Sequence, residues 1–161
     1  FNAMTTKIVD NILDQKEADA IEKELMSVFF PWYYQDSVSD KSNTNDFYFT
    51  HILYENLEQS SYFNLIIPIL KKIKYKKLIR VKANLYPGFD KKVIHPKHVD
   101  YTYNTNGAIY YVNTNNGTTN LTNKKIESVK NRLLYFNASK PHNSTTCTDK
   151  KIRLNININY L

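Results

Sequence analysis

The chain has 161 residues, a length typical of one domain that can bury an apolar core. Its hydrophobic fraction of 42% and aromatic fraction of 14% indicate a globular protein rich in strand-forming residues. No apolar run approaches the roughly 18 residues that cross a bilayer, which excludes the class of proteins anchored by a membrane-spanning helix. Residues 1–3 precede Met4 and are interpreted as a cloning remnant, so residues 4–161 are expected to form a single domain.

The formal net charge of +7 has two interpretations. A compositional bias toward lysine, asparagine, isoleucine and tyrosine accounts for it, because the lysines are scattered among acidic and amide residues. The alternative is a field that attracts anions, either small dicarboxylates or nucleic acid. Cys147 is the only cysteine, so the chain forms no internal disulfide, and a cytoplasmic location is expected.

The first helix is expected soon after the start of the chain. Residues 7–13 alternate in hydropathy and predict a short strand. Asp14 and Glu17 then have the spacing of a capping box. Apolar residues follow at spacings of three and four, which predicts one buried helix face that ends at Pro31. These apolar residues are Ala18, Ile21, Leu25 and Val28.

The next segment mixes strand, loop and helix signals. Residues 32–34 and 47–54 are rich in aromatic residues and predict strands. Between them, residues 36–46 are polar and turn-rich, and are interpreted as a mobile lid over a substrate. A second helix is expected between residues 60 and 73, with a kink or a break at Pro68.

From Lys77 onward the pattern changes to strands separated by short turns. Eight strands are expected, at residues 78–86, 93–101, 108–112, 118–122, 125–129, 132–136, 142–147 and 152–160. A hairpin turn is expected at residues 115–117, which are Asn-Asn-Gly. Eight serial strands after two helices predict a mainly β fold with a double-stranded β-helix core, of the jelly-roll or cupin-like kind, over residues 77–161.

The most informative stretch is His98-Val99-Asp100. Side chains two apart in a strand project from the same face, so the imidazole and the carboxylate lie together. They supply two ligands of a 2-His-1-carboxylate site, which leaves open positions on Fe(II). His142 opens the seventh core strand, which neighbours the second at one mouth of a jelly roll. His98, Asp100 and His142 are therefore expected to bind one metal ion, the alternative being a hydrogen-bonded surface pair.

Several segments give the second half of the chain a resemblance to one enzyme family. They are Tyr86-Pro87-Gly88, His98-Val99-Asp100, Tyr110-Tyr111-Val112-Asn113, Arg132-Leu133-Leu134-Tyr135-Phe136 and Pro141-His142. With them, residues 80–160 resemble the Fe(II)- and 2-oxoglutarate-dependent dioxygenases, most closely the prolyl-4-hydroxylase-like type. The resemblance implies Fe(II), 2-oxoglutarate and O₂ as cofactor and cosubstrates, with ascorbate as an accessory reductant. It also implies hydroxylation coupled to the release of succinate and CO₂.

The resemblance further implies how 2-oxoglutarate is held. Arg153 occupies the position of the basic residue that pairs with the distal carboxylate, for which arginine offers two-pronged geometry. Tyr86 and Tyr111 would donate hydrogen bonds to the cosubstrate. Asn84 shares a strand face with Tyr86 and would line the pocket. Core packing of the two tyrosines, and an edge-strand position for Arg153, are the structural alternatives.

Four other residues are given structural interpretations. His95 lies three residues before His98, so strand parity predicts that it faces away from the site, on a loop or at the surface. His51 has no partner in the sequence and is interpreted as structural. Arg132 is expected to form a structural ion pair, and Cys147 to pack as a small apolar residue.

Two classes of function fit these observations. The first is an oxygenase that hydroxylates a peptide side chain, such as proline, or a small polar substrate, and the same chemistry would demethylate a nucleobase or an amine. The second is a non-catalytic sensor that binds 2-oxoglutarate or metal on the same barrel. The complete triad and Arg153 favour the enzyme. The expected partner is a peptide or a small molecule rather than nucleic acid or a membrane, because no continuous basic track with aromatic platforms is evident.

Overall fold

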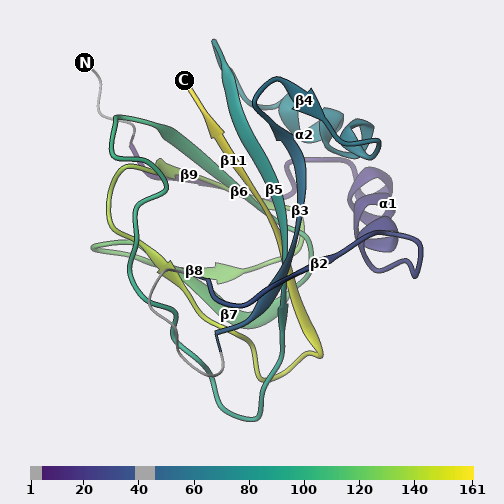
Figure 1. Cartoon of the computed structure of the whole chain (residues 1–161), viewed down its shortest axis with the longest axis vertical. Coiled ribbons are helices and arrows are strands. Elements are labelled where there is room, and N and C mark those ends of the chain that lie inside the picture. Colours follow the sequence, from purple (N-terminus) through teal and green to yellow (C-terminus); the bar gives the residue numbers. More distant parts are fainter. Residues whose placement is uncertain (1–4, 39–45) are drawn as a thin grey trace.

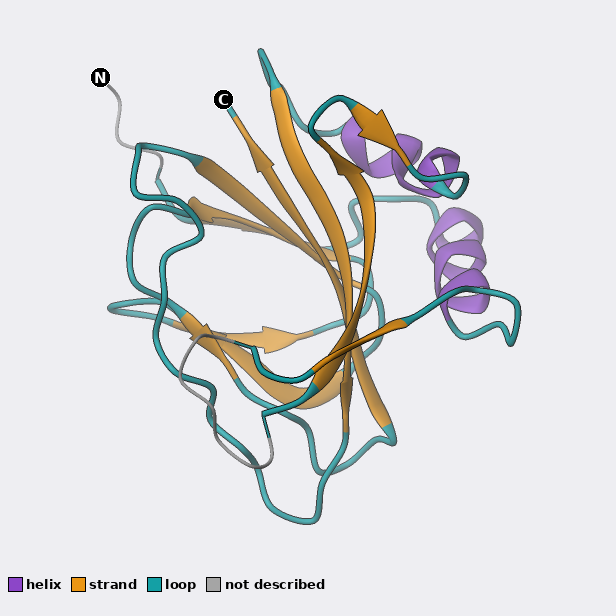
Figure 2. Ribbon diagram, in the orientation of Figure 1, coloured by secondary structure: helices purple, strands orange, loops and turns teal. Residues whose placement is uncertain are grey.

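The computed structural model describes residues 5–38 and 46–161, and its strands form two sheets (Figures 1 and 2). The strands are β1 (Lys7–Val9), β2 (Tyr33–Gln35), β3 (Tyr48–Glu55), β4 (Glu58–Gln59), β5 (Leu78–Pro87), β6 (Asn106–Tyr111), β7 (Asn115–Asn120), β8 (Lys125–Ser128), β9 (Arg132–Asn137), β10 (Asn143–Ser144) and β11 (Ile152–Tyr160). The helical segments are α1 (Gln15–Leu25), the 3₁₀ turn η1 (Phe63–Ile66) and α2 (Ile67–Leu70).

The larger sheet has eight strands in the order β1-β9-β6-β11-β5-β3-β2, with β4 paired to β3. The smaller sheet has the order β10-β7-β8. Figure 1 shows the smaller sheet opposite one face of the larger sheet, with α1 and α2 on the side of β3 away from it. This arrangement confirms the expected mainly β fold with a jelly-roll core and N-terminal helices.

Two strands at the centre of the larger sheet determine where the core and the polar face lie. Strand β5 pairs with β11 along its length, and both alternate apolar and polar residues. The apolar side chains pack with the helices in the main core, which includes Ile21, Leu25, Ile66, Val81, Ala83, Leu154, Ile156 and Ile158. The polar side chains therefore point toward the smaller sheet, where a second and smaller apolar cluster fills only part of the space.

Helix α1 ends earlier than expected. It stops at Leu25, and Val28 is 92% exposed, so Val28 is not part of the buried face. Asp14 is the N-cap residue, but its side chain makes no capping hydrogen bond. Ala18, Ile21 and Leu25 are buried as expected, because their spacing alone determines which face of the helix meets the sheet.

The expected second helix is replaced by two short pieces, η1 and α2. Pro68 lies in the first turn of α2, where its missing N–H costs no intrahelical hydrogen bond. The proline therefore starts a helix and does not kink one. Of the proposed lid over residues 36–46, residues 39–45 lie outside the described part of the chain. Within the described residues, no helix is long and apolar enough to cross a membrane.

One strand prediction and one turn prediction in the second half of the chain differ from the structure. Residues 93–101 form no regular strand, and only Ile94 and His98 make isolated bridges, to Thr145 and His142. The expected turn at residues 115–117 lies within β7, and the chain turns after it, where the Leu121 amide donates to the Lys124 carbonyl at 2.8 Å. The pairing of β7 with β8 is irregular between Asn115 and Thr118, where the Asn115 side chain accepts a hydrogen bond from the Gly117 amide at 2.9 Å.

Candidate metal and cosubstrate site

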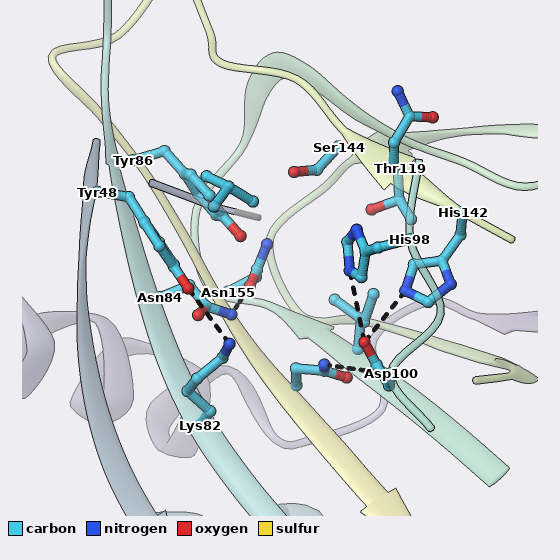
Figure 3. A pocket seen from close by; sticks show the side chains of 14 residues that line it. Tyr48, Lys82, Asn84, Tyr86, His98, Asp100, Thr119, His142, Ser144 and Asn155 are labelled. Carbon is cyan, nitrogen blue, oxygen red and sulfur yellow. Dashed lines mark hydrogen bonds and ion pairs between the residues drawn. The ribbon is translucent and has the colours of Figure 1, made fainter. Parts of the chain in front are cut away.

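The structure brings His98, Asp100 and His142 together on the inner side of the two sheets (Figure 3). One ligand atom from each lies within 4.8 Å of the others. Backbone amides fix this arrangement, since His98 and His142 exchange two hydrogen bonds of 2.9 Å and the Asp100 amide donates to the Ala138 carbonyl at 2.9 Å. The isolated bridge between His98 and His142 therefore brings the triad together, although residues 93–101 do not form the strand that was expected to do so.

The imidazoles are oriented for metal binding. His142 Nδ1–H donates to the Lys140 carbonyl at 2.9 Å, so in the neutral ring the lone pair that can bind a metal is on Nε2. His142 Nε2 lies 3.4 Å from Asp100 Oδ1, and His98 Nε2 lies 3.5 Å from the same oxygen. Two neutral imidazole nitrogens and one carboxylate oxygen are the donor set that suits Fe(II), so these residues fit the metal implied by the resemblance.

The Asp100 carboxylate is 4% exposed, yet it is ionised. Burial alone would raise its pKa, but His142 and His98, which donate to it when their rings are protonated, and the Asn159 amide outweigh burial and hold the pKa far below its usual range. Its second oxygen accepts hydrogen bonds from Asn159 at 2.9 Å and from Asn157 at 3.1 Å. The polar face of β11 therefore orients the only carboxylate of the triad.

Arg153 lies on the same face of β11 and is fully buried. Its Nε donates to Ser128 Oγ at 3.0 Å and one terminal nitrogen donates to Thr119 Oγ1 at 3.3 Å. Its other terminal nitrogen, Nη1, is buried without a hydrogen-bond partner among the described residues. A buried guanidinium that lacks a carboxylate partner carries a large desolvation cost. This orphaned donor fits an anionic ligand such as the distal carboxylate of 2-oxoglutarate.

Of the other three residues predicted to bind the cosubstrate, two line the pocket and one does not. Tyr86 and Asn84 line the pocket that contains the triad, and the Arg153 guanidinium carbon lies 5.3 Å from the centre of the Tyr86 ring. Tyr111 is not among the residues that line this pocket, and its hydroxyl donates to Thr119 at 2.8 Å. Thr119 itself lines the pocket, so Tyr111 supports a residue of the pocket lining and is not part of that lining.

The prediction for His95 is right about the loop and wrong about the surface. Its side chain is buried and does not face the surface. Nε2 lies 3.5 Å from Asp46 Oδ1, Nδ1 lies 2.8 Å from Ser144 Oγ, and the ring stacks on Tyr86 at 5.3 Å. Strand parity failed because residues 93–101 are not a regular strand, so the alternation is not continuous between His95 and His98.

The three remaining structural interpretations agree with the contacts. His51 contacts the Pro31 carbonyl and Ser60 Oγ through its two ring nitrogens, at 2.8 and 2.6 Å. Arg132 pairs with Asp10 at 2.7 Å. Cys147 is buried. None of these side chains lines the pocket that contains the triad.

Sequence reasoning missed several polar residues of the site. They are Tyr48, Lys82, Thr119, Ser128, Asn157 and Asn159. The signal for some of them was present, because Lys82 has the parity of Asn84, and Asn157 has the parity of Arg153. The asparagines of β11 were interpreted only as one half of an alternating pattern, although the strand is paired on both sides and its polar face is enclosed.

Gly117 gives a testable link between packing and ligand binding. A Cβ at this position would lie 2.5 Å from Arg153 Cδ and 2.8 Å from Arg153 Nε. Gly117→Ala should therefore displace the guanidinium and weaken 2-oxoglutarate binding at least tenfold. Overpacking of this kind costs about 1–3 kcal/mol of stability, which denaturant unfolding would measure beside the ligand titration. A folded Gly117→Ala protein with unchanged affinity would contradict the position assigned to the cosubstrate.

Comparisons with known proteins place this geometry in context. The sequence matches no protein-family model, and no curated protein matches it. A prolyl hydroxylase from Trichoplax adhaerens, in complex with a hypoxia-inducible-factor peptide, is similar in structure with a TM-score of 0.69 at 14% identity, over 97% of this chain and 83% of that chain. A prolyl-4-hydroxylase from Pseudomonas putida gives 0.65 at 12% identity, over 98% and 92%.

The similarity extends beyond hydroxylases. A non-haem α-ketoglutarate-dependent epimerase from nogalamycin biosynthesis gives a TM-score of 0.70 at 11% identity, over 99% of this chain and 78% of that chain. At these identities the likeness concerns the fold, and it spans nearly the whole chain in each case. The chain therefore has the fold of the Fe(II)- and 2-oxoglutarate-dependent oxygenases, in the form found in prolyl hydroxylases.

Proposed function

We propose that the protein is an Fe(II)- and 2-oxoglutarate-dependent oxygenase that hydroxylates a peptide side chain or a small polar substrate. The observation that carries the proposal is that the triad and Arg153 occur together in the space between the two sheets. A His-Asp-His cluster lines the pocket, and a fully buried arginine with a free donor contacts two other residues of the pocket lining, Thr119 and Tyr86. The complete triad together with this arginine favours an enzyme over a non-catalytic sensor.

Bound Fe(II) with 2-oxoglutarate supplies the oxidising power, and one oxygen atom of O₂ enters a C–H bond as a hydroxyl while the other enters succinate as CO₂ is lost. The protein contributes ligands, orientation and exclusion of water. His98, Asp100 and His142 would hold the metal. Asn157 and Asn159 keep the carboxylate oriented and ionised, and Arg153, steadied by Ser128 and Thr119, would bind the distal carboxylate of the cosubstrate.

Several further features belong to the same proposal. The peptide seen in the Trichoplax adhaerens complex supports a peptide substrate for this chain as well. Residues 4–161 form one domain, O₂ is the oxidant, and ascorbate keeps the metal reduced. The sensor and the demethylase on the same barrel remain the alternatives that the following experiment separates.

The test is the release of succinate. Purified protein with Fe(II), 2-oxoglutarate and ascorbate should release succinate above a metal-free control, and candidate peptides or metabolites should increase the rate. A gain of one oxygen atom in the substrate, measured by mass spectrometry, identifies a hydroxylase. Formaldehyde would identify a demethylase. Tight 2-oxoglutarate binding with no succinate under any substrate pool would contradict the enzyme and favour the sensor.

A further inference from the structure

Lys82 lines the pocket that contains the triad, and it lies toward the other end of the polar face from Arg153. Strand β5 places Lys82 opposite Asn157 of β11, whereas Tyr86 lies opposite Arg153. Lys82 and Tyr86 are four residues apart, about 13 Å along a strand. Asp100 accepts hydrogen bonds from Asn157, which lies opposite Lys82, and from Asn159, which lies opposite Arg80. The triad therefore lies over the Lys82 end of the polar face.

Lys82 has few partners for a cation in the middle of a central strand. Its Nζ lies 3.4 Å from the Tyr48 hydroxyl and 5.7 Å from the centre of that ring. In the described ranges, 5–38 and 46–161, no carboxylate forms an ion pair with it. Burial, and then the nearby Arg80 guanidinium, lower the pKa of Lys82 to about 8, so the ammonium is still mostly charged at neutral pH.

The rest of the pocket lining is also polar. Apart from Val38 and Ile109, every lining residue carries a hydrogen-bonding or titratable group, and these are Tyr48, Lys82, Asn84, Tyr86, His98, Asp100, Thr119, His142, Asn143, Ser144, Asn155 and Asn157. Figure 3 shows Lys82 and Tyr48 on the side of the pocket away from His98 and His142. Such a lining offers little contact area to a wholly apolar side chain and several donors to an oxyanion.

We propose that Lys82 anchors a carboxylate of the primary substrate, with the Tyr48 hydroxyl as a second donor. The substrate is then a small carboxylic acid, such as a free amino acid, or a carboxylate-bearing side chain. Its C–H bond would lie between the Lys82 anchor and the triad. This inference rests on the proposed function, because it assigns Arg153 to 2-oxoglutarate and leaves Lys82 for the molecule that is oxidised.

The assignment of the two cations follows from their surroundings. Arg153 is fully buried and fixed by two hydroxyl acceptors, which suits a cosubstrate that is the same in every turnover. Lys82 is only partly buried, and the hydrogen bond from its Nζ to the Tyr48 hydroxyl is long, at 3.4 Å, so its flexible ammonium can meet carboxylates at different positions. A substrate without an anion would leave this cation desolvated and unpaired.

Acetate and acetamide test the anchor without knowledge of the substrate. The protein is loaded with Zn(II) and saturating 2-oxoglutarate, and its lysines are labelled with ¹³C at Cε. The Lys82 resonance is assigned as the one that is present in the wild-type spectrum and absent from the spectrum of Lys82→Met. Acetate should shift it saturably, and acetamide should move it at most a tenth as far. The exposed Lys74 serves as the control resonance and should respond equally to both. Equal responses at Lys82, or no response to acetate, would overturn the inference.

The cosubstrate titration separates the two proposals. Lys82→Met should melt at or above the wild-type temperature, because a partly buried cation is replaced by an apolar side chain of similar length. A loss of 2-oxoglutarate affinity as large as that of Arg153→Met would make Lys82 a cosubstrate residue and overturn the inference. If wild-type protein does not bind 2-oxoglutarate, the proposed function fails. If it binds 2-oxoglutarate while acetate leaves Lys82 unchanged, only the anchor is wrong.

Discussion

Asp100→Ala should abolish 2-oxoglutarate-dependent turnover and lower the affinity for a divalent metal ion by more than a hundredfold. The carboxylate oxygen is the point where both histidines converge, at 3.4 and 3.5 Å. Residues that merely support a metal ligand cost about 10–100-fold in affinity when they are lost, so the ligand itself should cost more. Anaerobic titration with Mn(II), followed calorimetrically, measures the affinity, and succinate release measures the turnover.

Asp90→Ala is the matched control for this variant. Asp90 is exposed, so its removal changes the net charge by the same amount at the surface. It should bind metal and turn over as the wild type does. Circular dichroism should show that Asp100→Ala retains its strands, because the main core lies on the other side of the sheet. Coupled succinate release at a near-normal rate in Asp100→Ala would refute the triad.

Arg153→Met should weaken 2-oxoglutarate binding by a hundredfold or more. Removal of one partner from a buried ion pair costs roughly 3–5 kcal/mol, and each 1.4 kcal/mol is about tenfold in affinity. Methionine fills part of the volume, so the loss reports the charge and the hydrogen bonds more than a cavity. The binding constant is measured with the Zn(II)-loaded protein, in which turnover does not interfere.

Arg153→Lys distinguishes the charge from the geometry. Lysine keeps a positive charge but loses the bonds that the guanidinium makes to Ser128 and Thr119. It should recover part of the affinity that Arg153→Met loses. Tyr86→Phe should weaken 2-oxoglutarate binding less, by about 1 kcal/mol of binding free energy, which is the net contribution of one hydrogen bond. Equal affinity in the wild type and Arg153→Met would place the cosubstrate elsewhere in the structure.

The alternation of β5 and β11 made much of the site predictable. Parity alone correctly grouped Asn84 with Tyr86, because both strands are regular and long. The same rule would have added Lys82 and Asn157, had the polar face been interpreted as enclosed. Whether a polar face meets water or another sheet depends on the tertiary structure, and no local pattern in β11 carries that information.

The failures lie where the backbone is irregular. His95 was expected at the surface and is buried, because residues 93–101 form no regular strand and have only two isolated β-bridges. The Asn-Asn-Gly signal at residues 115–117 did not give the hairpin turn, because Asn115 bonds locally, its side chain accepting from the Gly117 amide at 2.9 Å, at an irregularity in the pairing of β7 with β8. Turn residues fit such positions as well, because their short polar side chains bond to nearby backbone groups.

The pairing of β5 with β11 also determines how the chain folds. The hydrogen bond between Asn84 and Asn155 joins residues 71 positions apart, and the one from Asn159 to Asp100 spans 59. The chain must lose the entropy of closing loops of this length before such contacts can stabilise it. Topologies of this kind therefore fold in milliseconds to seconds rather than microseconds. The polar rows of β5 and β11, which hold Asp100 and Arg153 in place, belong to this long-range pairing. A partly folded chain, even one with its helices and local hairpins in place, therefore has no ligand site at all.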